Sequence, residues 1–197
     1  MMTPQPVSKK HIKGKRIRAK RFKQLLAKPG YNKIKIFIET GTWEGIQNKI
    51  ATDSNKFDII YGIELDDHWY EITKELNPKS IIIHGDTVIE LPKILEKHSN
   101  EPLFIYLDAH YCATNPPIAK SAFPLWKELQ LIKDRGMSDI VAIDDVKNFG
   151  VDRDGYNEWE TITIENINNL FGDSIVDCLI SDGAYIIYLK GLYGVVR

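Results

Sequence analysis

The sequence predicts an α/β fold in which helices cover both faces of a mostly parallel β-sheet. Short apolar runs rich in Ile and Phe alternate with segments of helical length, and several runs end in an acidic residue. The last two runs are joined only by Ser181-Asp182-Gly183. Strands that alternate with helices pair in parallel, whereas a three-residue connection permits only an antiparallel hairpin. A seven-stranded mixed sheet follows.

The length of 197 residues, 43% of them hydrophobic, suits one well-buried core. We therefore expect one folded domain, residues 31–197, after a basic arm, residues 1–30. No apolar run approaches the roughly 20 residues of a membrane span, and the N-terminus has no apolar signal core. Cys112 and Cys178 share no metal-binding spacing and fit a reducing compartment, so a cytoplasmic location is expected.

The charge is divided unevenly along the chain. Residues 1–28 hold ten Lys or Arg and no acid, which leaves 16 basic and 27 acidic residues in the remainder, a formal charge of −11. Such an arm could bind nucleic acid or anionic lipid, dock on its own acidic domain, or stay solvated. Apolar residues in its second half indicate a helix, which Lys28-Pro29-Gly30 ends.

Each predicted element rests on a local signal. β-branched and aromatic runs favour strands. Asp66-Asp67 is a cap signal for the helix that follows, and Pro92 is expected to interrupt or bend another helix. In chain order the predicted strands are 34–39, 57–64, 80–85, 103–108, 140–145, 174–180 and 184–189, and the predicted helices are 44–53, 67–76, 87–97, 121–135 and 158–170.

A nucleoside-type site is predicted after the first strand. Glu39 ends this strand, and Gly41 and Gly45 bracket a turn where a missing Cβ lets a ligand approach the backbone. Glu64 follows about 20 residues later, a spacing that places a carboxylate at ribose hydroxyls. Trp43 stands where a middle glycine is common, which disfavours a pyrophosphate. The alternative for these residues is a tight turn and a solvated strand end.

A second group of polar residues follows the fourth and fifth predicted strands. Asp108 and His110 come after one strand, and Asp144 and Asp145 after the next. Carboxyl ends of parallel strands meet at one edge, so these acids could share a hard cation, with Mg²⁺ the default. The alternatives are a cap role for Asp108 and opposite orientations of Asp144 and Asp145, which only a bend would align.

These motifs together resemble the class I S-adenosylmethionine-dependent methyltransferases over residues 33–197. The resemblance implies a Rossmann-like three-layer sandwich. It implies that Glu39-Thr-Gly-Thr-Trp-Glu-Gly45 holds the methionine part of the cofactor, that Glu64 takes the ribose hydroxyls, and that Asp86 contacts the adenine. Asp86 could instead simply cap the next helix.

The acids resemble the metal site of cation-dependent O-methyltransferases. Catechol-type enzymes show Asp and then Asp-Asn, whereas macrocin-type sugar enzymes show Asp and then Asp-Asp, as here. Catechol-type enzymes also have a lysine where this chain has Tyr111, which leaves the general base open between His110 and a carboxylate. Aromatic residues that could line the acceptor pocket are Tyr111, Trp126, Tyr156 and Trp159.

The predicted function is S-adenosylmethionine-dependent methyl transfer, assisted by a divalent cation, to a hydroxyl of a small molecule, which could be a sugar. The alternatives are a nucleic-acid methyltransferase or binding module that uses the basic arm, and a non-catalytic cofactor-binding domain. The sequence does not identify the acceptor or the oligomeric state. The predicted residues are Asp108 and His110 for catalysis, Glu39, Thr40, Gly41, Thr42, Trp43, Gly45, Glu64, Asp86 and Asp108 for the cofactor, and Asp108, Asp144 and Asp145 for the metal.

Overall fold

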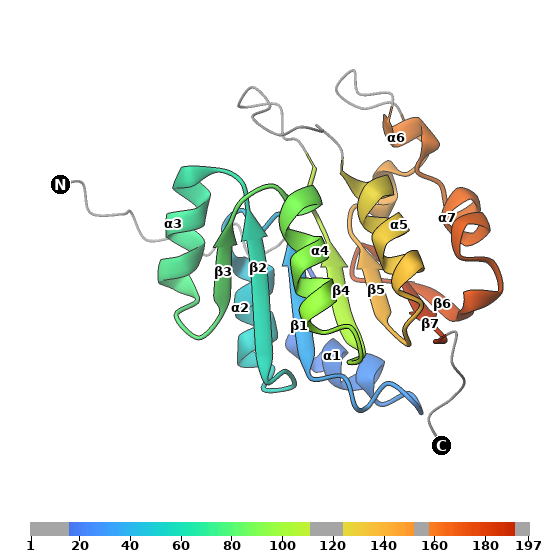
Figure 1. The fold of residues 1–197 in the computed structure, drawn as a ribbon, viewed down its shortest axis with the longest axis horizontal. Coiled ribbons are helices and arrows are strands. Elements are labelled where there is room, and N and C mark those ends of the chain that lie inside the picture. Colours follow the sequence, from blue (N-terminus) through green and yellow to red (C-terminus); the bar gives the residue numbers. More distant parts are fainter. Residues whose placement is uncertain (1–15, 111–123, 152–157, 192–197) are drawn as a thin grey trace.

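A seven-stranded sheet forms the centre of the protein, in the strand order β3-β2-β1-β4-β5-β7-β6 (Figure 1). The computed structural model describes residues 16–110, 124–151 and 158–191. All pairs are parallel except β5–β7 and β6–β7. The predicted mostly parallel sheet with a C-terminal antiparallel hairpin is therefore confirmed. The strands are β1 (Ile36–Thr40), β2 (Ile59–Glu64), β3 (Ile81–His84), β4 (Leu103–Leu107), β5 (Ile140–Ile143), β6 (Ile175–Ser181) and β7 (Ala184–Leu189).

The helices follow the prediction except near the C-terminus. They are α1 (Ala19–Leu26), α2 (Ile46–Asp53), α3 (Asp67–Leu76), α4 (Thr87–Lys97), α5 (Leu125–Arg135), α6 (Glu158–Thr161) and α7 (Ile164–Phe171), with 3₁₀ turns at Val146–Asn148 and Gly172–Ser174. The single helix predicted over 158–170 is wrong, because Thr163 has an extended backbone and caps a new helix by accepting a hydrogen bond from the Asn166 N–H. Pro92 lies within α4 without interrupting it. Residues 121–123 of the predicted fifth helix lie outside the described residues.

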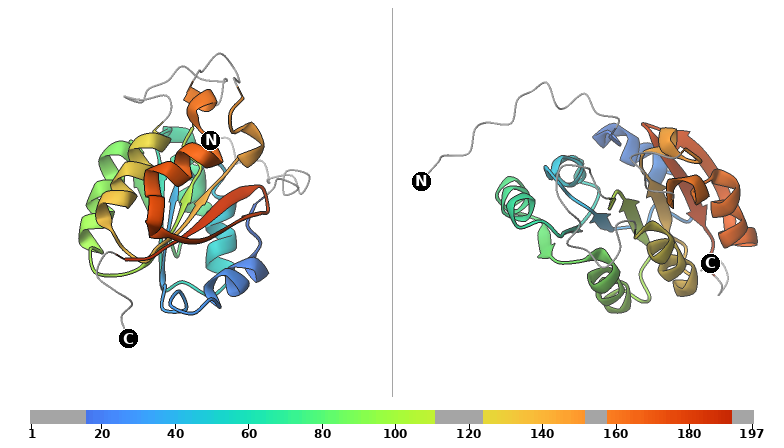
Figure 2. Two further views of the ribbon diagram at one scale, coloured as in Figure 1. Left: turned by 90° about the vertical axis from the view of Figure 1, so that its right-hand side faces the viewer. Right: turned by 90° about the horizontal axis from the view of Figure 1, so that it is seen from above.

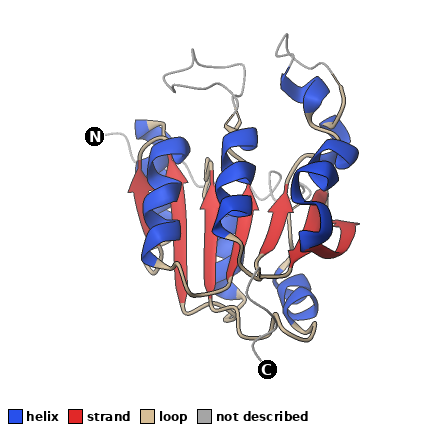
Figure 3. Ribbon diagram, turned by 45° about the vertical axis from the view of Figure 1, so that its right-hand side comes forward, coloured by secondary structure: helices blue, strands red, loops and turns tan. Residues whose placement is uncertain are grey.

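Helices cover both faces of the sheet, so the central strands are buried on both sides (Figure 2, Figure 3). Alternate strand residues enter two separate clusters, as the two-residue period of a strand requires. Apolar residues of α4, α5 and α7 fill one cluster, and those of α1 and α2 fill the other. The carboxyl ends of β1, β2, β4 and β5 therefore emerge at one edge between two helical layers.

The second half of the basic arm is part of this packing. As predicted it is helical, and Phe22 on α1 is fully buried with its ring 5.7 Å from Phe37 and 5.2 Å from Phe104, edge to face. Lys28 forms an ion pair with Asp177 on β6. Of the uses considered for the arm, docking on the acidic domain is the one seen for its described residues.

The β6–β7 hairpin brings a further acid to the carboxyl edge. Asp182 and Gly183 both have positive φ, 52° and 90°, as a two-residue primed turn requires. The Gly183 carbonyl accepts a hydrogen bond from the Val146 N–H just beyond β5. Because β7 runs antiparallel to β5, this turn lies beside the tip of β5. Among the described helices, none is both long and apolar enough to cross a bilayer.

Candidate functional site

Gly41 allows the first strand tip to pack against the fourth. Its φ is +69°, and an added Cβ would lie 2.7 Å from Ala109 Cα and 2.8 Å from the Asp108 carbonyl oxygen. The structure gives a further reason for this glycine, because the space that a Cβ would need is taken by the backbone that follows β4. A contact of Gly41 with the cofactor stays a prediction. The glycine turn and the β4 tip are consequently locked together.

The rest of the turn is held by α3. Thr73 donates a hydrogen bond to the Trp43 carbonyl at 2.7 Å, and Asn77 donates one to the Gly45 carbonyl at 3.1 Å. Trp43 has a φ of 47°, which is costly for a side chain as bulky as indole. Its half-exposed ring meets Trp69 edge to face at 5.6 Å. The strained turn is thus fixed before any ligand arrives.

Glu64 ends β2 beside this turn, on the same rim, and holds it through its carboxylate. One oxygen accepts hydrogen bonds from the Trp43 N–H at 2.6 Å and the Thr42 hydroxyl at 3.3 Å. The other oxygen accepts from the backbone N–H groups of Leu65 and Asp66. The predicted ribose ligand is therefore also a structural anchor, whose weakest contact is the one with Thr42.

Glu39 differs from Glu64 in its hydrogen bonding. It is fully buried, and neither carboxylate oxygen has a hydrogen-bond partner among the described residues. Burial raises the pKa of Glu39 to about 8, against the opposing effects of the Arg16 charge and of the nearby Asn48 side chain. A buried carboxylate without a donor is costly unless a cation or donor approaches it. Its chemistry fits the ammonium of the methionine part of S-adenosylmethionine.

Asp86 acts as a helix cap in this structure. Its side chain is the N-cap of α4 and accepts a hydrogen bond from the Val88 N–H at 2.9 Å. The cap alternative stated for this residue is therefore observed. A contact of Asp86 with adenine stays a prediction.

Glu128 is a buried acid that the sequence analysis missed. It is fully buried on α5 and faces the hydroxyls of Thr87 and Thr40. Burial raises the pKa of Glu128 to about 7, although these hydroxyls oppose the shift. The sequence did contain a signal that Glu128 is buried. The i, i+3, i+4, i+7 spacing of a buried helix face is shared by Leu125, Glu128, Leu129 and Ile132.

The acids after β4 and β5 lie close enough to influence one another electrostatically. Strand β5 ends at Ile143, and Asp145 takes a left-handed conformation with φ 57°, which supplies the bend that the alignment of Asp144 and Asp145 requires. Burial and the nearby Asp144 charge raise the pKa of Asp108 well above its usual range. Burial also raises the pKa of Asp144. These carboxylates therefore lie in a poorly hydrated, mutually repelling group.

His110 lies between two of these acids. Its Nδ1 is 3.7 Å from Asp108 Oδ1, and its Nε2 is 3.7 Å from Asp145 Oδ2. The Trp159 ring meets the imidazole edge to face at 5.5 Å. A cavity of about 10 Å³, room for about one water molecule, is bordered by Asp108, His110, Asp144 and Trp159, with Leu125. The arrangement suits proton transfer, because both neighbouring carboxylates stabilise an imidazolium.

Arg16 is the second residue that the sequence analysis missed. Its Nη1 lies 3.7 Å from Asp108 Oδ2, and its charge opposes the raised pKa of Glu39, Asp108 and Asp144 alike. The residue comes from the basic arm, far from the acids in sequence. Only packing of α1 against the sheet brings it to this edge.

The acids beyond β4 and β5 have oxygen donors of the kind that bind a divalent ion. Their hard carboxylate oxygens are the donors that Mg²⁺ prefers, and crowding that raises the pKa of two of them is a condition that a cation relieves. In donor chemistry they fit. In the part of the chain that is described, however, no group of three or more acidic, His or Cys side chains is arranged to hold a metal. Arg16, His110 and Lys147 instead form ion pairs with the acids.

The predicted acceptor-pocket residues divide into three cases. Trp159 borders the cavity beside His110. Trp126 packs against the core and donates a hydrogen bond to Thr161 at 2.8 Å, a structural role. Tyr111 and Tyr156 lie outside the described residues.

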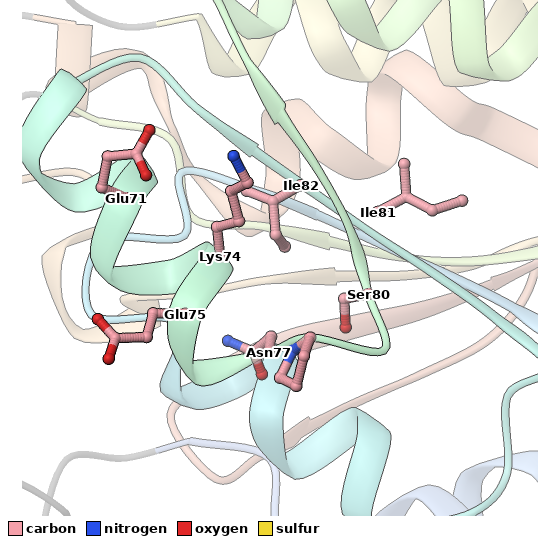
Figure 4. Close-up of a pocket in the computed structure, with 8 residues that line it drawn as sticks. Glu71, Lys74, Glu75, Asn77, Ser80, Ile81 and Ile82 are labelled. Carbon is pink, nitrogen blue, oxygen red and sulfur yellow. The ribbon is translucent and has the colours of Figure 1, made fainter.

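A larger hollow lies elsewhere. It is an open groove of about 650 Å³ between α3 and the start of β3, lined by Lys74, Ser80 and Ile81 among others (Figure 4). This groove is at the amino end of β3, away from the acids at the carboxyl edge. Its two acids, Glu71 and Glu75, both come from α3, and the groove is a surface feature rather than the candidate site.

Comparisons with known proteins agree with this geometry at the level of fold. No family model matches the sequence, and no curated relative was found. An O-methyltransferase from Bacillus cereus, solved with S-adenosylhomocysteine, superposes with a TM-score of 0.51 at 13% identity over 95% of this chain and 84% of that one.

Two other solved structures are more similar in TM-score. A candidate O-methyltransferase from Klebsiella pneumoniae has a TM-score of 0.59 at 11% identity, with 96% of this chain and 84% of that one covered. A candidate caffeoyl-CoA O-methyltransferase from Staphylococcus aureus has a TM-score of 0.56 at 16% identity, with 87% and 82% covered. The protein has the Rossmann-like fold of the class I S-adenosylmethionine-dependent methyltransferases.

Proposed function

We propose that the protein is an S-adenosylmethionine-dependent O-methyltransferase that acts on a hydroxyl of a small molecule. The observation that carries this proposal is Glu39, a fully buried carboxylate without hydrogen-bond partners among the described residues, placed beside a preformed glycine turn. The fold adds support, because the similar Bacillus cereus protein was solved with the product form of this cofactor.

The cofactor would lie along the tips of β1, β2 and β3. Residues Glu39 to Gly45 would hold its methionine part, with Glu39 accepting hydrogen bonds from the ammonium. Glu64 would receive the ribose hydroxyls in place of its long contact with Thr42. Asp86 would face the adenine from the start of α4. Binding along rigid strand tips orients the methyl group toward β4 and β5.

The acceptor would bind beyond β4 and β5. Asp108, Asp144 and Asp145 would hold a divalent cation, which would relieve the repulsion among these carboxylates and supply Lewis acidity at the acceptor hydroxyl. His110 would take the hydroxyl proton, and the carboxylates of Asp108 and Asp145 on either side would stabilise its charged form. Trp159 would help to exclude water from this region.

The other functions considered have less support. Arg16, Arg18 and Lys28 of the basic arm form ion pairs with acids of the domain, which leaves these charges less available to nucleic acid. A non-catalytic cofactor-binding domain would not need His110 between two acids. A sugar as the acceptor, and Mg²⁺ as the ion, are part of the proposal on the grounds of the Asp then Asp-Asp pattern.

The test begins with calorimetry of the purified protein against S-adenosylhomocysteine, NAD and Mn²⁺. We expect binding of the first and third and none of NAD. Methyl-labelled S-adenosylmethionine is then offered with catechols, phenols and sugars, with Mg²⁺ or with EDTA. Binding of NAD alone would overturn the proposal, whereas methyl transfer unaffected by EDTA would overturn only the role of the cation.

A further inference from the structure

We propose that Arg16 binds the carboxylate of the methionine part of S-adenosylmethionine. The inference rests on the proposed function and extends it to a residue that precedes α1. It gives the basic arm a role in cofactor selection, since the arm would supply the cation that recognises a zwitterionic amino acid.

The backbone around Arg16 is fixed at the carboxyl edge of the sheet. Ile17 is fully buried, and its carbonyl accepts a hydrogen bond at 3.2 Å from Gln47, a fully buried residue on α2. Arg18 pairs with Asp182 in the β6–β7 turn at 3.2 Å. Residues 16–18 are thus attached on both sides, to the helix that follows the glycine turn and to the hairpin beside β5.

The Arg16 side chain points into the group of acids. Its side chain is 17% exposed, and that of Asp108, its ion-pair partner, is 15% exposed. The separation of 3.7 Å exceeds the 2.7–2.9 Å typical of a charge-assisted hydrogen bond. Among the described residues this ion pair is the contact that the guanidinium makes, so its five N–H donors retain capacity for an anion.

The charges around Arg16 match the two ends of an amino acid. An ammonium suits Glu39, whose buried oxygens have no donor in the described part of the chain. The carboxylate beside that ammonium would meet repulsion from Glu39, Asp108 and Asp144 unless a cation lay next to them. Arg16 is such a cation, since its charge acts on all three acids. Its planar fork also matches a carboxylate in shape.

The experiment measures the affinities of two ligands for the unmutated protein and for the Arg16→Gln variant. S-adenosylhomocysteine carries the ammonium and the carboxylate, whereas 5′-(3-aminopropylthio)-5′-deoxyadenosine keeps the ammonium and lacks the carboxylate. Calorimetry on the full chain should show that Arg16→Gln weakens binding of S-adenosylhomocysteine by about 10- to 100-fold, the range of hydrogen bonds between charged groups. Binding of the aminopropyl compound should change by less than about threefold on the same scale.

Two further variants control for charge and folding. Arg18→Gln removes the same charge two residues away, at a side chain that is 65% exposed, and should leave both affinities unchanged. Arg16→Lys keeps the charge and loses the planar guanidinium, so its affinity for S-adenosylhomocysteine should lie between those of Arg16→Gln and the unmutated protein. Thermal melting of each variant verifies that it is folded.

Three results would overturn the inference. Equal loss of both ligands in Arg16→Gln would indicate a structural role, and unchanged affinity for S-adenosylhomocysteine would indicate none. Tighter binding of S-adenosylhomocysteine would show that Arg16 occupies the site as a tethered cation. Failure of the unmutated protein to bind S-adenosylhomocysteine would instead contradict the proposed function itself.

Discussion

The two halves of the carboxyl edge differ in how their acids are satisfied. At the tip of β2, Glu64 accepts four hydrogen bonds, three of them from backbone N–H groups of its own and the neighbouring turn. Beyond β4 and β5, Asp108 and Asp145 have ion pairs at 3.5–3.7 Å with the side chains of Arg16, His110 and Lys147. The first half is built by the backbone and is rigid. The second is held by side-chain ion pairs that are longer than these hydrogen bonds.

The carboxylates of the site are therefore of two kinds, those that accept hydrogen bonds from the backbone and those that lie next to other carboxylates. A carboxylate that holds backbone donors supports the fold and the cofactor together, so its loss affects both. A carboxylate crowded by other carboxylates costs stability when ionised, because burial and repulsion have raised its pKa. Buried carboxylates with this cost in stability are found at functional sites, where a ligand or a cation compensates their charge.

Asp144→Asn gives the largest expected effect. Mn²⁺ affinity should fall at least about 100-fold and methyl transfer about 1000-fold, because one oxygen ligand and one negative charge are removed. Affinity for S-adenosylhomocysteine should stay within about threefold. The measurements are calorimetry and transfer of a labelled methyl group. Unchanged Mn²⁺ affinity would remove Asp144 from the proposed metal site.

Glu64→Gln is the matched control for that variant, because it also replaces one carboxylate by an amide. It should weaken S-adenosylhomocysteine binding by about tenfold or more and leave Mn²⁺ affinity unchanged, since an amide nitrogen cannot accept the Trp43 or Leu65 N–H. If both variants lost both ligands, the two halves of the edge would not be separable.

Gly41→Ala tests the contact that joins the two halves. The free energy of unfolding should fall by about 3 kcal/mol or more, from the positive φ together with overlap with Ala109 Cα. Gly30→Ala is the control, since Gly30 has a φ of +91° and no neighbouring atom within 4 Å of an added Cβ. It should cost only about 1 kcal/mol. Equal losses in urea unfolding would show that the close approach contributes nothing.

Glu128→Gln should change how stability depends on pH. Because the folded-state pKa is raised to about 7 from 4.5, the protein loses stability as pH rises through this range, and the neutral variant does not. The stability of the variant relative to the unmutated protein should therefore increase by about 2–3 kcal/mol between pH 5 and pH 8. Urea unfolding at both values measures this difference, and a constant difference would contradict an ionisable buried Glu128.

The positions that the sequence predicted well are those where local patterns and the strand period suffice. Alternation of apolar runs with helical segments predicted the sheet, and Ser181-Asp182-Gly183 predicted its antiparallel end. Parallel strands place their carboxyl ends at one edge, so acids after four strands could be assigned to that edge before coordinates were known. The assigned roles of those acids stay predictions.

Tertiary structure alone decided which groups meet those acids. Arg16 reaches Asp108 across 92 positions of sequence only because Phe22 and its neighbours bury α1 on the sheet. Glu64 accepts hydrogen bonds from the backbone, whereas Glu39 has no hydrogen-bond partner among the described residues, although both acids lie near strand ends. Sequence patterns record which face of an element is apolar. They do not record which side chains from distant elements converge, because that depends on the packing of whole helices against the sheet.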